Sequence, residues 1–260
     1  MKFLIFAPPY RNSSAGIRVL HRLGQELNNI GCKAFVFTAW NKTAELRPNI
    51  GDCIVIYPEI VPGNPMGAKN VVRYLLNTPG HNGIGDTTYA DSELVFVYTR
   101  PLLAAAQSST SQKLDDSRLM EISVIEPWLF QPKPEVEKVY DVAFWIGKGI
   151  ATAQASMDKI QAYMKGKNSL QITYELPSTR EGLALLFQSS RELLTADDFT
   201  AMIPEAILCG CKATIMTPDG PVPFLEDVSR WGTSWHDLRP IHNFVNICRQ
   251  TFLPCAAAAA

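Results

Sequence analysis

The sequence predicts an α/β protein made of two doubly wound halves, and three observations support this. Strand-like apolar runs alternate with amphipathic helical stretches, the pattern of βαβ units and a parallel sheet. The strands are continuous apolar runs rather than alternating ones, so both faces of each sheet are expected to be covered. A Pro-rich, charged segment at 131–138 divides the chain, and the same layer plan begins again after it.

The first half is predicted to consist of four strands and two helices. The helix at 16–31 is expected because apolar residues recur along it at helical spacing and Gly31 closes it. The helix at 64–80 is expected to stop at Pro79 and Gly80. The predicted strands are 2–7, 33–40, 52–59 and 92–99.

The second half repeats this plan and ends in a helix. Its predicted strands are 140–149, 170–176, 192–196 and 212–216, and its helices are 152–165, 179–188, 199–210 and 236–253. We therefore expect domains at 1–131 and 132–240, followed by a terminal helix at 241–255. The poly-Ala tail at 256–260 is left out of the fold argument.

Composition and charge narrow the class of protein. The 260 residues are 47% hydrophobic and 19% charged, which is ordinary for a soluble globular chain, and the net charge is −1. Nucleic-acid binding is not expected, because such proteins usually carry a basic excess. No apolar run reaches the roughly 18 residues that a membrane-spanning helix needs, and residues 1–10 read as a strand rather than a signal peptide. The expected compartment is the cytoplasm.

Six scattered cysteines, most of them in apolar runs, are expected to be buried thiols. Cys209 and Cys211 lack a second ligand pair at zinc spacing, and the histidines show no metal-binding spacing. No metal and no cofactor are expected.

The stretch 195–216, "TADDFTAMIPEAILCGCKATIM", places two acids around a helix start. Asp197 and Glu205 are separated by seven residues, and the free amides at a helix start favour an anion. A carboxylate at Glu205 can accept two hydrogen bonds from a vicinal diol such as a ribose. The plainer alternative is that Asp197 or Asp198 caps the helix and Glu205 is a solvated helix residue.

This stretch resembles the acidic signature of GT-B glycosyltransferases, which use nucleotide-sugar donors. Asp197 stands for the first Glu of that signature, Phe199 for the aromatic residue after it, and Glu205 for the second Glu. Two departures are that Asp197 is shorter than Glu and that Thr200 replaces a usual Gly. The resemblance implies that Asp197 and the amides near Phe199 and Thr200 address the donor sugar and diphosphate. It also implies that Glu205 holds the ribose.

Further segments match the same family. Gly147 and Lys148 lie where the family neutralises the donor diphosphate, although a second cation is missing; the alternative is an exposed turn lysine. Backbone groups near Glu175 and Leu176 are expected to face the base. In the first half, Gly16 would open the helix that faces the donor.

Three residues of the first half are candidates for the acceptor side or for phosphate. The glycine-rich loop 77–86 carries His81 as a candidate catalytic residue, beside Asp86. Arg11 and Arg18 could serve the acceptor or phosphate. The alternative for each is an ordinary solvated residue.

The resemblance implies two Rossmann-like domains facing a cleft, in a compact version. The N-terminal domain would serve the acceptor and the C-terminal domain would bind the nucleotide-sugar. The expected activity is hexosyl-type transfer to a saccharide or lipid-linked acceptor in surface polysaccharide or lipopolysaccharide biosynthesis, with peripheral association at the inner face of the membrane left open. Two alternatives stand beside it: a nucleotide-sugar-binding module without turnover, and a sugar-nucleotide epimerase of related fold.

Overall fold

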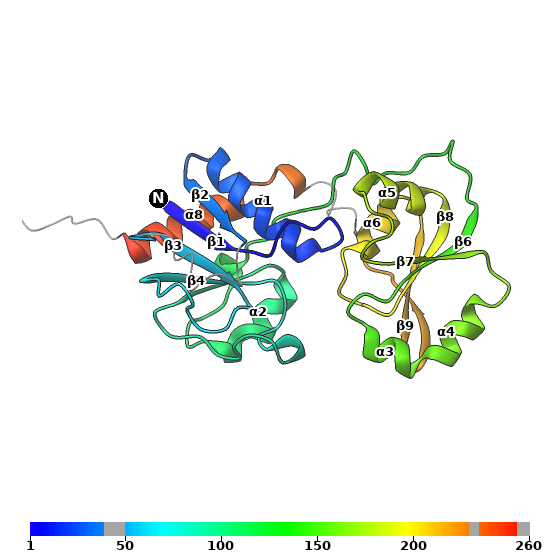
Figure 1. Ribbon diagram of the computed structural model, residues 1–260, viewed down its shortest axis with the longest axis horizontal. Coiled ribbons are helices and arrows are strands. Elements are labelled where there is room, and N and C mark those ends of the chain that lie inside the picture. The colour runs from blue at the N-terminus through cyan, green and yellow to red at the C-terminus, as the bar shows by residue number, and fades with distance from the viewer. Residues whose placement is uncertain (39–49, 229–233, 254–260) are drawn as a thin grey trace, which may run out of the picture. The chain divides into compact units, whose positions relative to one another are not determined.

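The structure, a computed structural model, describes residues 1–38, 50–228 and 234–253 (Figure 1). Its contacts divide the chain into two units. Unit 1 contains Met1–Arg11, Gly16–Ile122 and the chain from Asp237 on, and unit 2 contains Asn12–Ala15 and Ser123–His236. The division therefore falls at 122/123, earlier than the expected boundary at 131/132. The last two residues of the predicted strand 33–40, and residues 254–260, lie outside the described residues.

Unit 1 is built on a five-stranded parallel sheet in the order β2-β1-β3-β4-β5. The strands β3 and β5, both expected from the sequence, are buried along their whole length, which confirms that these continuous apolar runs mark strands covered on both faces. The elements are β1 (Lys2–Phe6), α1 (Ala15–Asn29), β2 (Lys33–Phe37), β3 (Ile54–Pro58), β4 (Asn70–Leu75), η2 (His81–Gly83), β5 (Leu94–Val97), α2 (Arg100–Ala106), η3 (Gln107–Ser109), η4 (Asp116–Arg118) and α8 (Arg239–Phe252).

The predicted helix at 64–80 is wrong, because its central part is strand β4. The run "NVVRYL" has apolar residues that fit either a helix or a strand over so short a length. In the fold it lies between β3 and β5, where both of its faces are buried and its backbone groups pair on both sides. Tertiary position therefore decides the conformation of this segment.

The C-terminal helix α8 belongs to unit 1 rather than standing alone after the second domain. The ring of Phe244 on α8 lies 5.6 Å from the ring of Phe3 on β1 and 4.9 Å from the ring of Phe96 on β5. In Figure 1 the red helix accordingly lies beside the blue first strand. The last residues of the described chain thus complete the core that the first residues begin.

Unit 2 contains a second five-stranded sheet, in the order β10-β9-β8-β6-β7, with only β10 antiparallel. The expected helix at 152–165 is divided at Ser156 into two helices, and β10 was not expected from the sequence. The elements are β6 (Tyr140–Trp145), α3 (Ile150–Ala155), α4 (Met157–Met164), β7 (Ser169–Ile172), α5 (Arg180–Gln188), β8 (Ser190–Thr195), α6 (Met202–Leu208), β9 (Lys212–Thr217), β10 (Gly220–Pro223) and η5 (Ser234–His236).

The two sheets share one strand order. Counted within its own unit, each sheet runs 2-1-3-4-5, the order of one common doubly wound fold. The expected pair of Rossmann-like units is therefore confirmed. In such sheets ligands bind beyond the carboxyl ends of the strands on either side of the point where the order reverses. That point lies between β1 and β3 in unit 1, and between β6 and β8 in unit 2.

Candidate functional site

The turn after β6 lies at the reversal point of unit 2 and is built around two glycines. Gly147 has a φ of +55°, a conformation that residues with a Cβ rarely adopt. Gly149 packs so closely on the residue that follows β8 that an added Cβ would lie 2.0 Å from the carbonyl oxygen of Ala196. The segment 147–149 therefore needs both glycines to lie against the end of β8.

Asp197, which follows β8, holds this turn. Its side chain is buried, its Oδ2 accepts a hydrogen bond of 3.0 Å from the backbone N–H of Lys148, and its Oδ1 accepts one of 3.3 Å from the N–H of Phe199. The structure thus brings together four residues singled out in the sequence: Gly147, Lys148, Asp197 and Phe199. Part of the hydrogen-bonding capacity of the Asp197 carboxylate is already used by the protein.

The side chain of Lys148 is exposed. Its ammonium forms no ion pair with any residue in the described part of the chain. A cation that is fixed by its backbone at the reversal point, but not neutralised by a neighbour, suits an anionic ligand.

The start of α6 is less prepared for an anion than the sequence suggested. The helix has 7 residues, the hydroxyl of Thr200 accepts a 3.4 Å hydrogen bond from the N–H of Met202, and the N–H of Phe199 is engaged by Asp197. The amides expected to face a diphosphate are therefore partly satisfied from within the loop.

Glu205 on α6 is buried, with 1% of its surface exposed, rather than solvated. Its Oε1 accepts a 2.7 Å hydrogen bond from Arg180 Nη2, and the same nitrogen lies 2.7 Å from Glu126 Oε2. The Arg180 guanidinium also lies over the ring of Phe130, 4.4 Å from its centroid. Burial alone would lower the pKa of Arg180, but the carboxylates of Glu205 and Glu126 outweigh it and raise that pKa.

The buried cluster of Arg180, Glu126 and Glu205 could not be recognised from the sequence. Its members lie on three separate segments, and each one alone looks like a surface charge. Arg180 is the one basic residue of the apolar helix α5, but this position does not indicate which carboxylates it pairs with.

Glu175 and Leu176 lie in the turn after β7. Their backbone N–H groups, which were expected to face a nucleobase, both donate to the hydroxyl of Thr173, at 3.2 Å and 3.1 Å. The N–H of Thr173 in turn donates to the carbonyl of Leu176 at 2.8 Å. These backbone groups are therefore hydrogen-bonded within the turn. The side chains of Glu175 and Leu176 are exposed to solvent.

Trp145, the last residue of β6, was not among the expected site residues. It is 4% exposed, and its Nε1 is buried without a hydrogen-bond partner in the described chain. The ring of Tyr174 packs edge-on against it at 5.1 Å. Its placement beside Gly147 and Asp197 is visible only in three dimensions.

The candidates of unit 1 are dispersed over separate elements. His81 begins η2, and its Nε2 is buried with no hydrogen-bond partner in the part of the chain that the structure describes. Gly16 lies in the first turn of α1, and Arg18, farther along the same helix, is buried with 5% of its surface exposed. Arg11 is exposed in the loop before that helix.

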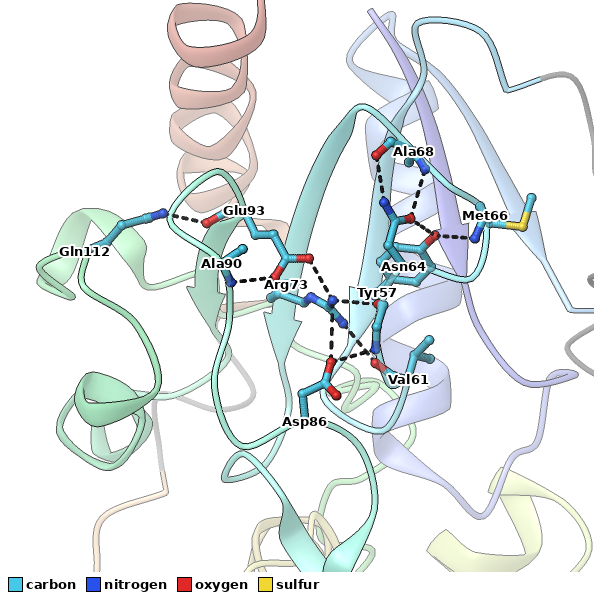
Figure 2. Close-up of polar contacts among 11 residues, drawn as sticks. Tyr57, Val61, Asn64, Met66, Ala68, Arg73, Asp86, Ala90, Glu93 and Gln112 are labelled. Carbon is cyan, nitrogen blue, oxygen red and sulfur yellow. Dashed lines mark hydrogen bonds and ion pairs between the residues drawn. The ribbon is translucent and has the colours of Figure 1, made fainter.

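The loop that carries His81 is fastened through Asp86. Asp86 Oδ2 accepts a 2.7 Å hydrogen bond from the N–H of Gly63 and lies 3.7 Å from Arg73 Nη2. Figure 2 shows Arg73 at the centre of this network, where it also donates to Glu93 Oε1 at 2.7 Å and to the carbonyl of Val61 at 2.9 Å. Asp86 therefore has a structural role in holding the loop.

The Arg73 guanidinium at the centre of the network is buried. Arg73 is 1% exposed, and its guanidinium lies over the rings of Tyr57 and Tyr89, at 5.3 Å and 5.1 Å. Burial raises the pKa of Tyr57 to about 12, so this hydroxyl stays protonated at neutral pH.

The described residues contain neither a cluster of metal-ligating side chains nor a membrane-spanning helix. Across 1–38, 50–228 and 234–253, no three His, Cys, Asp or Glu side chains gather in a metal-binding group. Among the same residues, no helix is both long and apolar enough to cross a bilayer.

The solved structures that resemble the chain include a glycosyltransferase. The chain is similar to the glycosyltransferase VinC. That protein was solved in complex with dTDP; the match has a TM-score of 0.33 and 12% sequence identity, and covers 97% of this chain and 94% of the other. No known family model matches the chain, and no curated protein matches it.

Proposed function

We propose that the chain is a glycosyltransferase that moves a sugar, of hexosyl type, from a nucleoside diphosphate-sugar to a saccharide or lipid-linked acceptor. The observation that carries this proposal is the hydrogen bond from the backbone N–H of Lys148 to the buried carboxylate of Asp197 at the reversal point of unit 2. An unneutralised cation and a buried carboxylate at that position suit a ligand with an anionic part and a hydroxylated part.

In this proposal the chain works through electrostatics rather than through a metal. The ammonium of Lys148 stabilises the negative charge that develops on the leaving diphosphate. Asp197 addresses the sugar and Glu205 the ribose, and on the acceptor side His81 is the candidate general base. We expect transfer to survive chelation by EDTA; turnover that is lost and then restored by Mg²⁺ or Mn²⁺ would contradict this.

The biological setting follows the resemblance of the 195–216 stretch. We propose surface polysaccharide or lipopolysaccharide biosynthesis, in the cytoplasm or at the inner face of the membrane.

Nucleotide binding is the first test. A thermal-shift series with UDP, GDP, dTDP, ADP and CMP should identify one nucleotide that raises the melting temperature. A ligand at 100 times its Kd stabilises the folded state by about 2.7 kcal/mol. Absence of a shift with every nucleotide would contradict the proposal.

A nucleotide-sugar-binding module without turnover is the second candidate. It is favoured by one observation: the carboxylates of both Asp197 and Glu205 already accept hydrogen bonds from the protein. Donor binding with neither hydrolysis nor transfer to any offered saccharide would select this candidate.

A further inference from the structure

The indole N–H of Trp145 is a buried donor that the fold leaves unused. Trp145 is 4% exposed, and Nε1 has no hydrogen-bond partner in the described chain. A buried donor without a partner destabilises the fold, so such groups are uncommon and call for an explanation. In a functional site, the explanation is a partner that arrives with the ligand.

The position of this donor is defined by Gly147. A Cβ built on Gly147 would lie 2.3 Å from Trp145 Nε1 and 2.5 Å from Asp197 Oδ2. The donor and the carboxylate oxygen therefore approach the same side of Gly147, and only a residue without a Cβ permits this. The three residues come from the ends of β6 and β8, the two strands that flank the reversal point.

A donor beside a carboxylate oxygen selects the chemistry of its ligand. A phosphate oxygen could accept from the indole N–H, but the negative charge of Asp197 would repel it. A hydroxyl group accepts from one neighbour and donates to the other, so it satisfies both. The cation for phosphate is Lys148, whose side chain is exposed.

We propose that Trp145 and Asp197 together bind one hydroxyl group of the transferred sugar, with Trp145 donating and Asp197 accepting. This inference rests on the proposed function and adds a specificity-determining residue to it. Because Nε1 is closed from solvent, the hydroxyl reaches it only when the surrounding turn shifts. Binding of the sugar therefore changes the environment of the indole, whereas binding of the nucleotide alone does not.

The test compares nucleotide with nucleotide-sugar in the full chain. The nucleoside diphosphate that binds in the thermal-shift series is titrated by calorimetry beside its glucose, galactose and N-acetylglucosamine conjugates. Trp145→Phe keeps an aromatic ring and removes the N–H. We expect the variant to bind the diphosphate like the wild type and the best conjugate about two- to tenfold more weakly. The fluorescence change on adding that conjugate should also disappear.

Trp128→Phe is the matched control, because Trp128 lies in the same unit and is 57% exposed. Trp128→Phe should change neither the affinity for the diphosphate nor the affinity for the conjugate. Equal affinity of Trp145→Phe and wild type for the conjugate would overturn the inference, and so would an equal loss for diphosphate and conjugate. The same holds if no conjugate binds the wild type more tightly than the diphosphate does. If the wild type binds no nucleotide at all, the proposed function fails and the inference falls with it.

Discussion

Each unit has a buried arginine that pairs with two carboxylates: in unit 1 this arginine lies within a strand, whereas in unit 2 it begins a helix. Arg73 on β4 pairs with Glu93 and Asp86, and the pairs fasten the loop that follows β4. Arg180 at the start of α5 pairs with Glu126 and Glu205 and lies against Phe130. Each unit therefore neutralises two carboxylates with one buried guanidinium.

The units differ at the point where their strand order reverses. In unit 2 this point holds Asp197 and the exposed ammonium of Lys148, which forms no ion pair with a described residue. In unit 1, Glu59 follows β3, is 6% exposed and accepts a 2.8 Å hydrogen bond from the N–H of Leu76. Two units with the same strand order thus use their carboxylates differently at this point. Glu59 binds the N–H of a residue that follows β4, whereas Asp197 binds the turn that carries the exposed Lys148.

The largest effect is expected from breaking the buried pair of unit 1. Arg73→Met leaves Glu93 in the interior without its cation, which typically costs about 3–5 kcal/mol of stability. The control is Arg100→Met, because the pair between Arg100 and Asp116 is exposed and is worth at most about 1 kcal/mol. Urea unfolding measures the free energy of unfolding of both variants. Similar losses in the two variants would show that burial does not distinguish these pairs.

The carboxylates of unit 2 allow structure and ligand binding to be separated. Glu205→Gln and Glu126→Gln each weaken a contact to the same Arg180 nitrogen, so both should destabilise unit 2. Only Glu205→Gln should also weaken nucleotide binding, by roughly 10- to 150-fold, through loss of a charge-assisted hydrogen bond to ribose. Calorimetry on the folded variants measures the nucleotide affinity of each. Equal affinities would remove Glu205 from the ligand site and leave it a purely structural role.

Lys148 tests whether the unpaired cation of unit 2 meets phosphate. Lys148→Ala should weaken binding of the nucleoside diphosphate about tenfold, or about 1.4 kcal/mol, and leave the bare nucleoside unaffected. Added salt should weaken the wild-type contact more than the variant's, because screening acts on the removed charge. Lys212→Ala is the control: this exposed lysine begins β9 and so lies at the amino ends of the parallel strands, whereas Lys148 lies beyond their carboxyl ends. An equal loss for nucleoside and diphosphate would indicate a folding defect instead.

The smallest effect is a pH dependence in the core of unit 2. Burial raises the pKa of the Cys209 thiol from 9.0 to about 12. As pH rises past 9, the unfolded chain loses a proton that the folded chain keeps, so the thiol's contribution to stability declines until the pH passes about 12. Between pH 7 and 9.5 the wild type should lose about 0.8 kcal/mol more stability than Cys209→Ala. Parallel pH profiles would show that the thiol titrates alike in both states.

The sequence revealed the layer plan because its strands are short, continuous apolar runs between amphipathic helices. It misassigned β4, since six buried residues fit either conformation until their neighbours are known. The same limit applies to the site. Gly147, Lys148 and Asp197 could be singled out by local motif, and the structure brings them together; their proposed roles stay predictions. Trp145 and the cluster of Arg180 with Glu126 depend on contacts between distant segments, so no local pattern indicates them.

The packing of Phe244 between Phe3 and Phe96 has a consequence for folding during synthesis. Apart from Asn12–Ala15, unit 2 is continuous in sequence, so all of its residues have been made once the ribosome has passed His236. The sheet of unit 1 is translated first, yet it lacks α8 until that helix has also been made. Contacts this distant in sequence tend to form slowly. In a nascent chain that ends at His236, unit 2 should therefore already resist protease while unit 1 is still cleaved.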